Sequence, residues 1–419
     1  MRITLINQFY VPDISPTAHL SASLADGLAS LGHEVTVVTS RGGYVAAAKT
    51  ESVEAANPRI YRVWTPQLGK KSILKRCIDY ASFYLLALLR MVRLPAQEVI
   101  ISLTTPPFIA WTGVFHRILH RRTRLILWNM DCYPDAAELA GVLKRGGLAS
   151  RVMRAMNRAL FRRLDYLICL DQAMVDLLVP QYAPRPSASR QALPVSIIPN
   201  WERASFFPRV SPSEVTKRPP ELAGKFVVLY MGNTGVGHPF EAVIEAARRL
   251  RDRGVMFYFI GGGKRWPWLQ EAKTREQLDN LVLHGYVAKE ETRRMMMSAD
   301  CALITLDSKM AGVMSPSKLH GNLAMGLPVI YVGPEKSNVD EAIRRFDCGV
   351  SLRDGDADGI VRFVERLLAA PEQRGEWQKR AREAFDAAFC DLRTLPQFCA
   401  ILEQFAPAEK QQPAATQIR

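Results

Sequence analysis

Short apolar runs alternate with amphipathic stretches along most of the 419-residue chain. The first apolar run covers residues 3–7, helical periodicity follows over 18–31, and a second apolar run covers 34–39. Runs of this length are typical of buried strands, and strands that alternate with helices form parallel sheets. The beginning of the chain therefore predicts a β-α-β unit of the doubly wound kind, in which ligands bind outside the carboxyl ends of the strands.

The alternation continues on both sides of a Pro-, Ser- and Arg-rich segment at 182–223. Further strand-like runs lie at 60–64, 99–103, 123–127, 165–170, 226–231, 256–260, 282–283, 302–306, 327–332 and 349–352, and helical stretches at 239–253, 290–299, 359–370, 373–389 and 398–405. We therefore expect two doubly wound α/β domains, residues 1–205 and 206–385, joined by a linker. Residues 386–405 are expected to pack back on the first domain, and the polar end, 406–419, to be disordered.

The composition, with 48% hydrophobic and 23% charged residues, is that of a soluble globular protein. Seven scattered cysteines without a C-x-x-C pair indicate reduced thiols rather than a disulfide framework or a zinc site. The chain enters a strand-like run directly, and no uncharged apolar run approaches the ~20 residues that span a bilayer. We therefore expect a cytosolic protein with neither a signal peptide nor a transmembrane helix.

The net charge is +14, and most of the excess lies in one part of the first domain. Residues 60–170 hold 18 Lys and Arg against 6 Asp and Glu, a net charge of +12. No signature of an RNA- or DNA-binding fold accompanies this charge. The basic region therefore favours an anionic membrane surface or an anionic substrate over nucleic acid.

An uncharged run, YASFYLLALL at 80–89, lies inside this basic region. Basic residues flank it on both sides, at Lys70, Lys71, Lys75, Arg76, Arg90 and Arg93, and further basic clusters follow at 117–124 and 144–163. Such a run suits a helix that lies in the membrane interface, although a buried core helix has the same pattern. We predict peripheral attachment to the cytoplasmic face of the plasma membrane.

The stretch AGVMSPSKLHGNLAMGLPVIYVG at 311–333 predicts an anion site. Ser315, Pro316 and Ser317 indicate a helix start, because Ser caps free N–H groups and Pro is tolerated at the first helical position. Lys318 then occupies the first turn, where acidic side chains are normally favoured. A cation at that point indicates a bound anion, although a solvated lysine on an ordinary β-α-β unit fits the pattern as well.

Two loops that follow strands are further candidates. The turn GNTGVG at 232–237 precedes a helix and lets the backbone approach a phosphate closely. Its spacing is not G-x-G-x-x-G, so it does not meet the dinucleotide fingerprint, and a tight turn without a ligand remains open. Asp131, after the run 123–127, can orient a hydroxyl or transfer a proton, or can simply cap a helix or add surface charge.

Taken together, several segments resemble the family-four retaining glycosyltransferases, which have the GT-B fold. They are, in chain order, NQFYVPDISPTAHLSASLADGLASLGHEVTVVTS at 7–40, SIIPNWERASFFP at 196–208, YMGNTGVGHPFEAVIEA at 230–246, LVLHGYVAKEE at 281–291 and SPSKLHGNLAMGLPVI at 315–330. The likeness covers about residues 1–400 and is strongest to the branch that makes O-antigen and colanic acid, which includes fucosyltransferases.

The resemblance implies transfer of a sugar from a nucleotide diphosphate donor, with retention at the anomeric centre. The acceptor in that branch is a polyprenyl-diphosphate-linked saccharide of bacterial cell-surface polysaccharide synthesis. The resemblance implies catalytic roles for Asp131 and Lys318 and places Thr17 and His19 near the cleft on the acceptor side. It implies donor contacts at Gly232, Asn233, Thr234, Gly235, Gly262, Tyr286, Val287, Ser315, Ser317, Lys318, Leu319 and Asn322.

The chain also departs from the family pattern. The glycine pair of the first loop is Ser15-Pro16, and the basic residue usual in the GNTGVG turn is missing, with Gly237 or His238 nearby. The glutamate that contacts the ribose is replaced by Gly321, and an earlier acidic position by Val313. The colanic acid branch, which the chain resembles, tolerates similar losses.

Two other functions remain open. A nucleotide-sugar epimerase can have the same fold, and so can a non-catalytic binding subunit that has lost its glutamates. We expect neither a metal nor a cofactor beside the nucleotide sugar, because Lys318 can balance the charge of a diphosphate. The seven histidines show no metal-ligand spacing with a carboxylate or cysteine.

Overall fold

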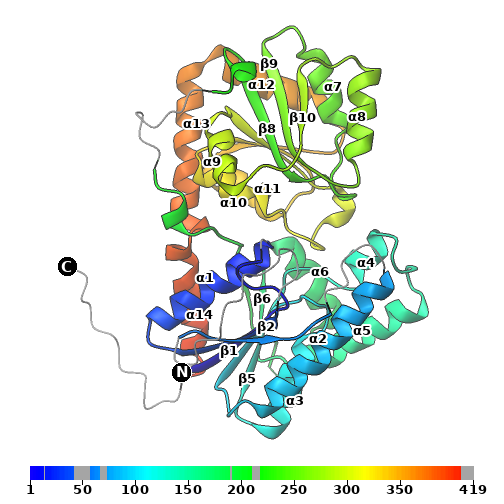
Figure 1. The fold of residues 1–419 in the computed structure, drawn as a ribbon, viewed down its shortest axis with the longest axis vertical. Coiled ribbons are helices and arrows are strands. Elements are labelled where there is room, and N and C mark those ends of the chain that lie inside the picture. Colours follow the sequence, from blue (N-terminus) through cyan, green and yellow to red (C-terminus); the bar gives the residue numbers. More distant parts are fainter. Residues whose placement is uncertain (14, 42–56, 67–72, 189–190, 210–217, 407–419) are drawn as a thin grey trace, which may run out of the picture.

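The computed structural model describes residues 1–13, 15–41, 57–66, 73–188, 191–209 and 218–406. Two α/β domains are stacked along the long axis of the molecule, and each is built on one parallel sheet (Figure 1). The predicted pair of doubly wound sheets is confirmed. Residues 407–419, two parts of the expected linker (189–190 and 210–217), Lys70 and Lys71 lie outside the described residues.

The N-terminal sheet has the strand order β3-β2-β1-β4-β5-β6-β7, and its pairings are parallel. Its strands are β1 (Arg2–Ile6), β2 (Glu34–Ser40), β3 (Arg59–Val63), β4 (Val99–Ser102), β5 (Arg124–Trp128), β6 (Tyr166–Cys169) and β7 (Val195–Ile197). Every residue of β4 is buried, as expected of a strand covered on both faces. The order reverses direction between β1 and β4, and this is the point where ligands bind in such sheets.

Helices cover both faces of this sheet. They are α1 (Pro16–Ser30), α2 (Ile73–Arg93), α3 (Ala110–Leu119), α4 (Asp135–Leu139), α5 (Leu148–Phe161) and α6 (Gln172–Tyr182). Because parallel crossovers are right-handed, α1 lies on one face and the connections from β3 onward lie on the other. Figure 1 shows α2, α3 and α5 side by side on that second face, where α2 contacts α3.

The C-terminal sheet has the order β10-β9-β8-β11-β12-β13. Its strands are β8 (Phe226–Asn233), β9 (Val255–Gly262), β10 (Leu281–His284), β11 (Cys301–Thr305), β12 (Val329–Val332) and β13 (Gly349–Leu352). Its helices are α7 (Glu241–Arg249), α8 (Trp266–Arg275), α9 (Lys289–Met297), α10 (Lys318–Ala324), α11 (Asn338–Phe346), α12 (Ala357–Ala369) and α13 (Pro371–Ala384). The carboxyl ends of both sheets face the space between the domains (Figure 1).

The chain crosses between the domains twice. Helix α13 continues through a π-helical turn (Phe385–Phe389) into α14 (Asp391–Glu403), which lies against α1 (Figure 1). Phe398 of α14 packs edge-on against Trp128 and Trp201, with ring centres 4.9 and 5.7 Å away. The two crossings meet at a bridge between Glu202 and Cys390. This aromatic cluster fixes the end of the chain to the core of the N-terminal domain.

Candidate functional site

The turn after β8 faces the side chain of Lys318. A Cβ atom added at Gly232 would lie 2.9 Å from Lys318 Cε, and the φ angle of Gly232 is +127°. Only glycine therefore allows the lysine chain to pass this close to the turn. The ammonium nitrogen lies 5.0 Å from the ring centre of Tyr230, within the range of a cation–π contact. The structure thus brings together the two segments that the sequence singles out as phosphate-binding.

His238 is the polar neighbour of Lys318. Its Nδ1 lies 2.6 Å from the carbonyl oxygen of Thr305, and its Nε2 lies 3.4 Å from Lys318 Nζ. Burial lowers the pKa of Lys318 to about 8. Burial, and then the charge of Lys318, lower the pKa of His238 to about 3. Within the described ranges, no carboxylate forms a salt bridge with Lys318, and its ammonium makes a polar contact with His238.

The expected helix start is wrong by two residues. Helix α10 begins at Lys318 rather than at Pro316, and the Ser317 side chain makes no capping hydrogen bond. The preceding backbone is held elsewhere, because the Pro316 carbonyl accepts a hydrogen bond from Asn338 Nδ2 (3.3 Å). With only seven residues, α10 offers little dipole, so the positive charge of the site comes from the Lys318 side chain.

The glycines at the carboxyl ends of β8 and β9 let the two strand ends lie close together. A Cβ at Gly261, whose φ is +143°, would run into the Gly232 carbonyl oxygen, and one at Gly263 into Asn233. Thr234 is fully buried, donates its backbone N–H to Gly262 (2.8 Å), and has a hydroxyl without a partner among the described atoms. Close approach of the two backbones is therefore the physical reason for these glycines.

Tyr286 offers an open aromatic face beside these turns. The ring is 71% exposed and lies against Gly262, where an added Cβ would be 3.1 Å from it. Asn233 and Ser317 are exposed as well, whereas Leu319 and Asn322 are buried and Val287 packs against the core. The Leu319 side chain belongs to the hydrophobic core, so the expected donor contact there is restricted to its backbone.

Asp131 lies where the two domains touch. The Thr104 hydroxyl accepts hydrogen bonds from the backbone N–H groups of Met130 and Asp131, both at 3.1 Å. Asp131 forms an antiparallel bridge with Met314, and Cys132 N–H donates to the Val313 carbonyl (3.0 Å). Burial raises the pKa of Asp131 to about 6. The loop that leads to Lys318 is thus docked on the N-terminal domain next to Asp131.

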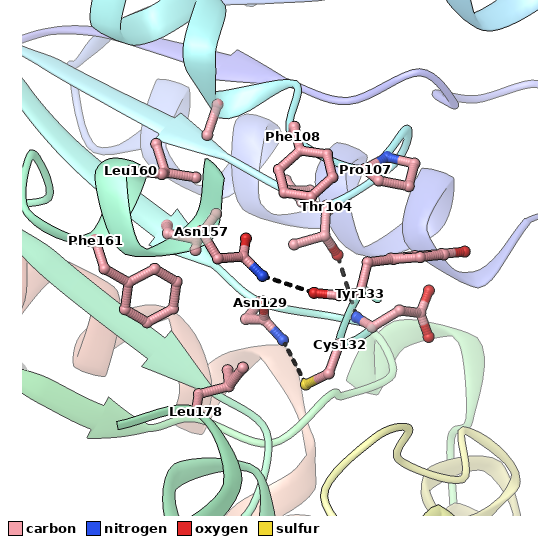
Figure 2. A pocket seen from close by; sticks show the side chains of 14 residues that line it. Thr104, Pro107, Phe108, Asn129, Cys132, Tyr133, Asn157, Leu160, Phe161 and Leu178 are labelled. Atoms are coloured by element: carbon pink, nitrogen blue, oxygen red, sulfur yellow. Dashed lines mark hydrogen bonds between the residues drawn. The ribbon is translucent and has the colours of Figure 1, made fainter. Parts of the chain in front are cut away.

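A small cavity lies under this loop in the N-terminal domain (Figure 2). Its volume of about 30 Å³ has room for one or two waters but not for a sugar. Asp131 is part of its wall, and two amides close it, with Asn129 bonded to Cys132 Sγ (3.3 Å) and Asn157 to the Tyr133 carbonyl (2.6 Å). The cavity is therefore not a substrate site. The amides in its wall hold the loop that carries Asp131.

The acceptor-side candidates belong to the N-terminal domain. Thr17 and His19 are in the first turns of α1, at the carboxyl end of β1. The Thr17 hydroxyl shares a 2.9 Å hydrogen bond with Ser15, and Pro16 occupies the first helical position. The Ser15-Pro16 pair that replaces the family's two glycines thus forms a regular helix start.

The described part of the chain holds no group of three or more His, Cys, Asp or Glu that could bind a metal ion. The sequence does contain an Asp-x-Asp-x-Asp run at 354–358, which spans the loop after β13 and the first residues of α12. Its carboxylates have other partners, because Asp354 accepts from Ser308, Asp356 caps Gly359, and Asp358 pairs with Arg249. Among the described helices, none combines the length and apolarity that crossing a membrane requires.

Comparisons with known proteins point to one family. A model described as "Glycosyl transferase 4-like domain" matches residues 18–194, and one described as "Glycosyl transferases group 1" matches residues 225–370. The chain is 23% identical over 403 residues to WcaI of Escherichia coli (strain K12), assigned as a colanic acid biosynthesis glycosyl transferase, covering 92% of this chain and 97% of WcaI. It is also 23% identical over 304 residues to WbjE of Pseudomonas aeruginosa, assigned as a glycosyltransferase, covering 72% and 74% of the two chains.

Solved structures agree on the fold. Sucrose-phosphate synthase from Thermosynechococcus elongatus superposes with a TM-score of 0.72 at 14% identity, over 96% of this chain and 98% of that one. HepE from Anabaena, solved in complex with UDP and glucose, gives a TM-score of 0.67 at 14% identity, over 96% and 100%. The expected GT-B fold is confirmed. With its two halves matched by the two glycosyltransferase models, the chain belongs to the family-four glycosyltransferases.

Proposed function

We propose that the protein is a retaining enzyme that moves a sugar from a nucleotide diphosphate donor to a polyprenyl-diphosphate-linked saccharide, in the synthesis of a cell-surface polysaccharide or O-antigen. The observation that carries this proposal is the Lys318 ammonium, which pairs with no carboxylate in the described part of the chain and faces the Gly232 turn beside the docked Asp131 loop. The assignment of WcaI to colanic acid synthesis supports the class of product. The UDP and glucose bound by HepE support the class of donor.

In this proposal the donor diphosphate lies between Lys318 and the Gly232 turn, with the base toward the open face of Tyr286. The bond between the anomeric carbon and the diphosphate oxygen breaks, and negative charge grows on the leaving group. Lys318 stabilises that charge, and preorganised groups of this kind are often the largest catalytic contribution. The acceptor oxygen bonds to the same face of the sugar, and its proton passes to a phosphate oxygen. Asp131 orients the reacting groups from the other domain.

An assay with and without acceptor tests the proposal against its alternatives. The purified protein is incubated with a panel of nucleotide diphosphate sugars, with and without a polyprenyl-diphosphate-linked saccharide. We expect release of nucleoside diphosphate that depends on the acceptor, and NMR of the product should show the donor's anomeric configuration. Conversion of the nucleotide sugar without acceptor would identify an epimerase. Binding without any conversion, seen as a ligand-induced shift in melting temperature, would identify a binding subunit.

We further propose that the second face of the N-terminal domain lies on the anionic cytoplasmic leaflet. Exposed apolar residues recur at helical spacing on three helices of this face, namely Ile78, Leu85, Leu89 and Val92 on α2, Phe115, Ile118 and Leu119 on α3, and Leu148, Val152 and Met156 on α5. Exposed basic residues border them, including Arg93, Arg121, Arg122, Lys144, Arg145, Arg151 and Arg158. Apolar side chains that enter the interface, beside cations that face anionic headgroups, match a lipid surface in chemistry.

A further inference from the structure

A histidine beside a phosphate site can bind the anion as a cation, but the hydrogen bonds of His238 require a neutral ring. The Thr305 carbonyl oxygen, 2.6 Å from Nδ1, can only accept a hydrogen bond, so Nδ1 must carry the proton. The ammonium of Lys318, 3.4 Å from Nε2, can only donate. A proton on Nε2 would set two donors against each other. The ring is therefore the neutral tautomer with its Nε2 lone pair toward Lys318.

We propose that His238 is a positioning residue, which holds the Lys318 ammonium over the Gly232 turn by accepting a hydrogen bond from it. The inference rests on the proposed function, in which Lys318 contacts the donor diphosphate. Tyr230 contacts the ammonium as well, with its ring centre 5.0 Å from the nitrogen. Its hydroxyl donates a hydrogen bond to the Asn233 carbonyl (2.9 Å). One N–H of the ammonium points to His238, and the remaining two are left for phosphate oxygens.

The surroundings of His238 support this role. Burial and the charge of Lys318 hold its pKa far below neutrality, so the ring stays neutral over the working pH range. A second cation at this position would compete with Lys318 for the same ligand and repel it. A neutral acceptor instead keeps the long lysine side chain in one direction, which lowers the entropy that is lost when the donor binds.

The first test needs no substrate. Nitrogen-15 NMR of the histidine rings in the full-length protein should show His238 as the neutral Nδ1–H tautomer from pH 5.5 to 8. A protonated ring near neutral pH, or the Nε2–H tautomer, would overturn the proposal even if the protein is an active transferase. Conversely, absence of transferase activity would defeat the proposed function without changing the tautomer.

The second test uses a pair of variants. In His238→Gln the amide oxygen takes the place of Nε2 and can accept from Lys318, whereas in His238→Asn the amide replaces Nδ1 and leaves Lys318 without an acceptor. We expect the Asn variant to lower kcat/KM and the affinity for UDP and GDP about tenfold, the scale of one hydrogen bond, and the Gln variant to stay within about threefold of wild type. His33→Asn, which alters the histidine directly before β2, at the amino ends of the strands of the N-terminal sheet, is the matched control. Equal losses in both variants, or no loss in either, would contradict a positioning role.

Discussion

A lysine that is partly buried without a carboxylate beside it loses hydration that its neutral neighbours replace only in part. For Lys318 this loss lowers the pKa from 10.5 to about 8. The ring face of Tyr230 and the Nε2 lone pair of His238 contact the ammonium but replace only part of the lost hydration. An anionic ligand restores the missing interaction. At the scale of single residues, turnover and the affinity for an anionic donor should therefore depend on whether Lys318 is present and whether it is charged.

Replacing Lys318 with Ala should lower turnover by about 10²- to 10³-fold, because one preorganised donor to the developing charge is lost. The fold should survive, and circular dichroism and thermal unfolding check this. Lys309→Ala is the control, since Lys309 is an exposed lysine of the same domain. Near-normal turnover in a well-folded Lys318→Ala protein would remove this residue from the mechanism.

Donor binding should weaken as the pH rises above about 8. Below its pKa of about 8 in the free protein, Lys318 already carries the proton that the diphosphate requires. Above that pH, binding must first restore the proton, so the affinity should fall roughly tenfold for each pH unit. His238, with a pKa of about 3, does not titrate in this range. Calorimetry with UDP and GDP from pH 6.5 to 9.5 measures the effect, and Lys318→Arg, which stays charged, should abolish the slope.

At the scale of elements, the alternation of apolar and amphipathic stretches was enough to predict both sheets and the order of their strands along the chain. Gly326, with a φ of +70°, follows the C-cap residue of α10, a position where glycine commonly ends a helix. The start of α10 was not predictable, because a contact with Asn338, 22 residues away, competes with the local capping signal of Ser315 and Pro316. The contact between Lys318 and His238 was also not predictable from the sequence. The two residues lie 80 positions apart, and a neutral histidine forms no charge pair that a sequence motif would indicate.

The paired strand ends of β8 and β9 should tolerate no side chain at Gly261. An added Cβ would run into the Gly232 carbonyl oxygen, and the φ of +143° is unfavourable for any other residue. We expect Gly261→Ala to lower the free energy of unfolding by about 2–4 kcal/mol, through overpacking and backbone strain. Chemical denaturation measures the change. Gly375→Ala, in α13 with open space around the added methyl group, should instead be neutral or slightly stabilising.

Helix α2 has two apolar faces, and substitutions on them should have opposite effects. Phe83, Ala87 and Met91 are fully buried in the N-terminal core, whereas Leu85 is 59% exposed. Leu85→Asp should therefore fold normally and lose co-sedimentation with anionic liposomes at low salt, while Phe83→Asp should unfold the domain. If the wild-type protein stays in the supernatant, or if Leu85→Asp unfolds it, the membrane proposal fails.

At the scale of the whole molecule, protein groups rather than a metal ion are proposed to balance the donor charge. Transferase activity should therefore persist in excess EDTA. Complete loss of activity in EDTA, with recovery on addition of Mg²⁺ or Mn²⁺, would show that a divalent ion is required. Neutral-pH assays with donor in excess avoid any confusion with the pH effect on Lys318.

The docked loop has a consequence for hybrid enzymes. Val313 belongs by sequence to the C-terminal half, but it is buried in the core of the N-terminal one, and the same is true of Phe398. A cut at the linker between β7 and β8 would therefore separate these residues from the core that they complete. An engineer who exchanges donor specificities between relatives should transfer a discontinuous unit, in which residues 311–314 and 390–405 stay with the acceptor half. The boundary along which such enzymes can be recombined follows the packing of the two cores rather than the order of the chain.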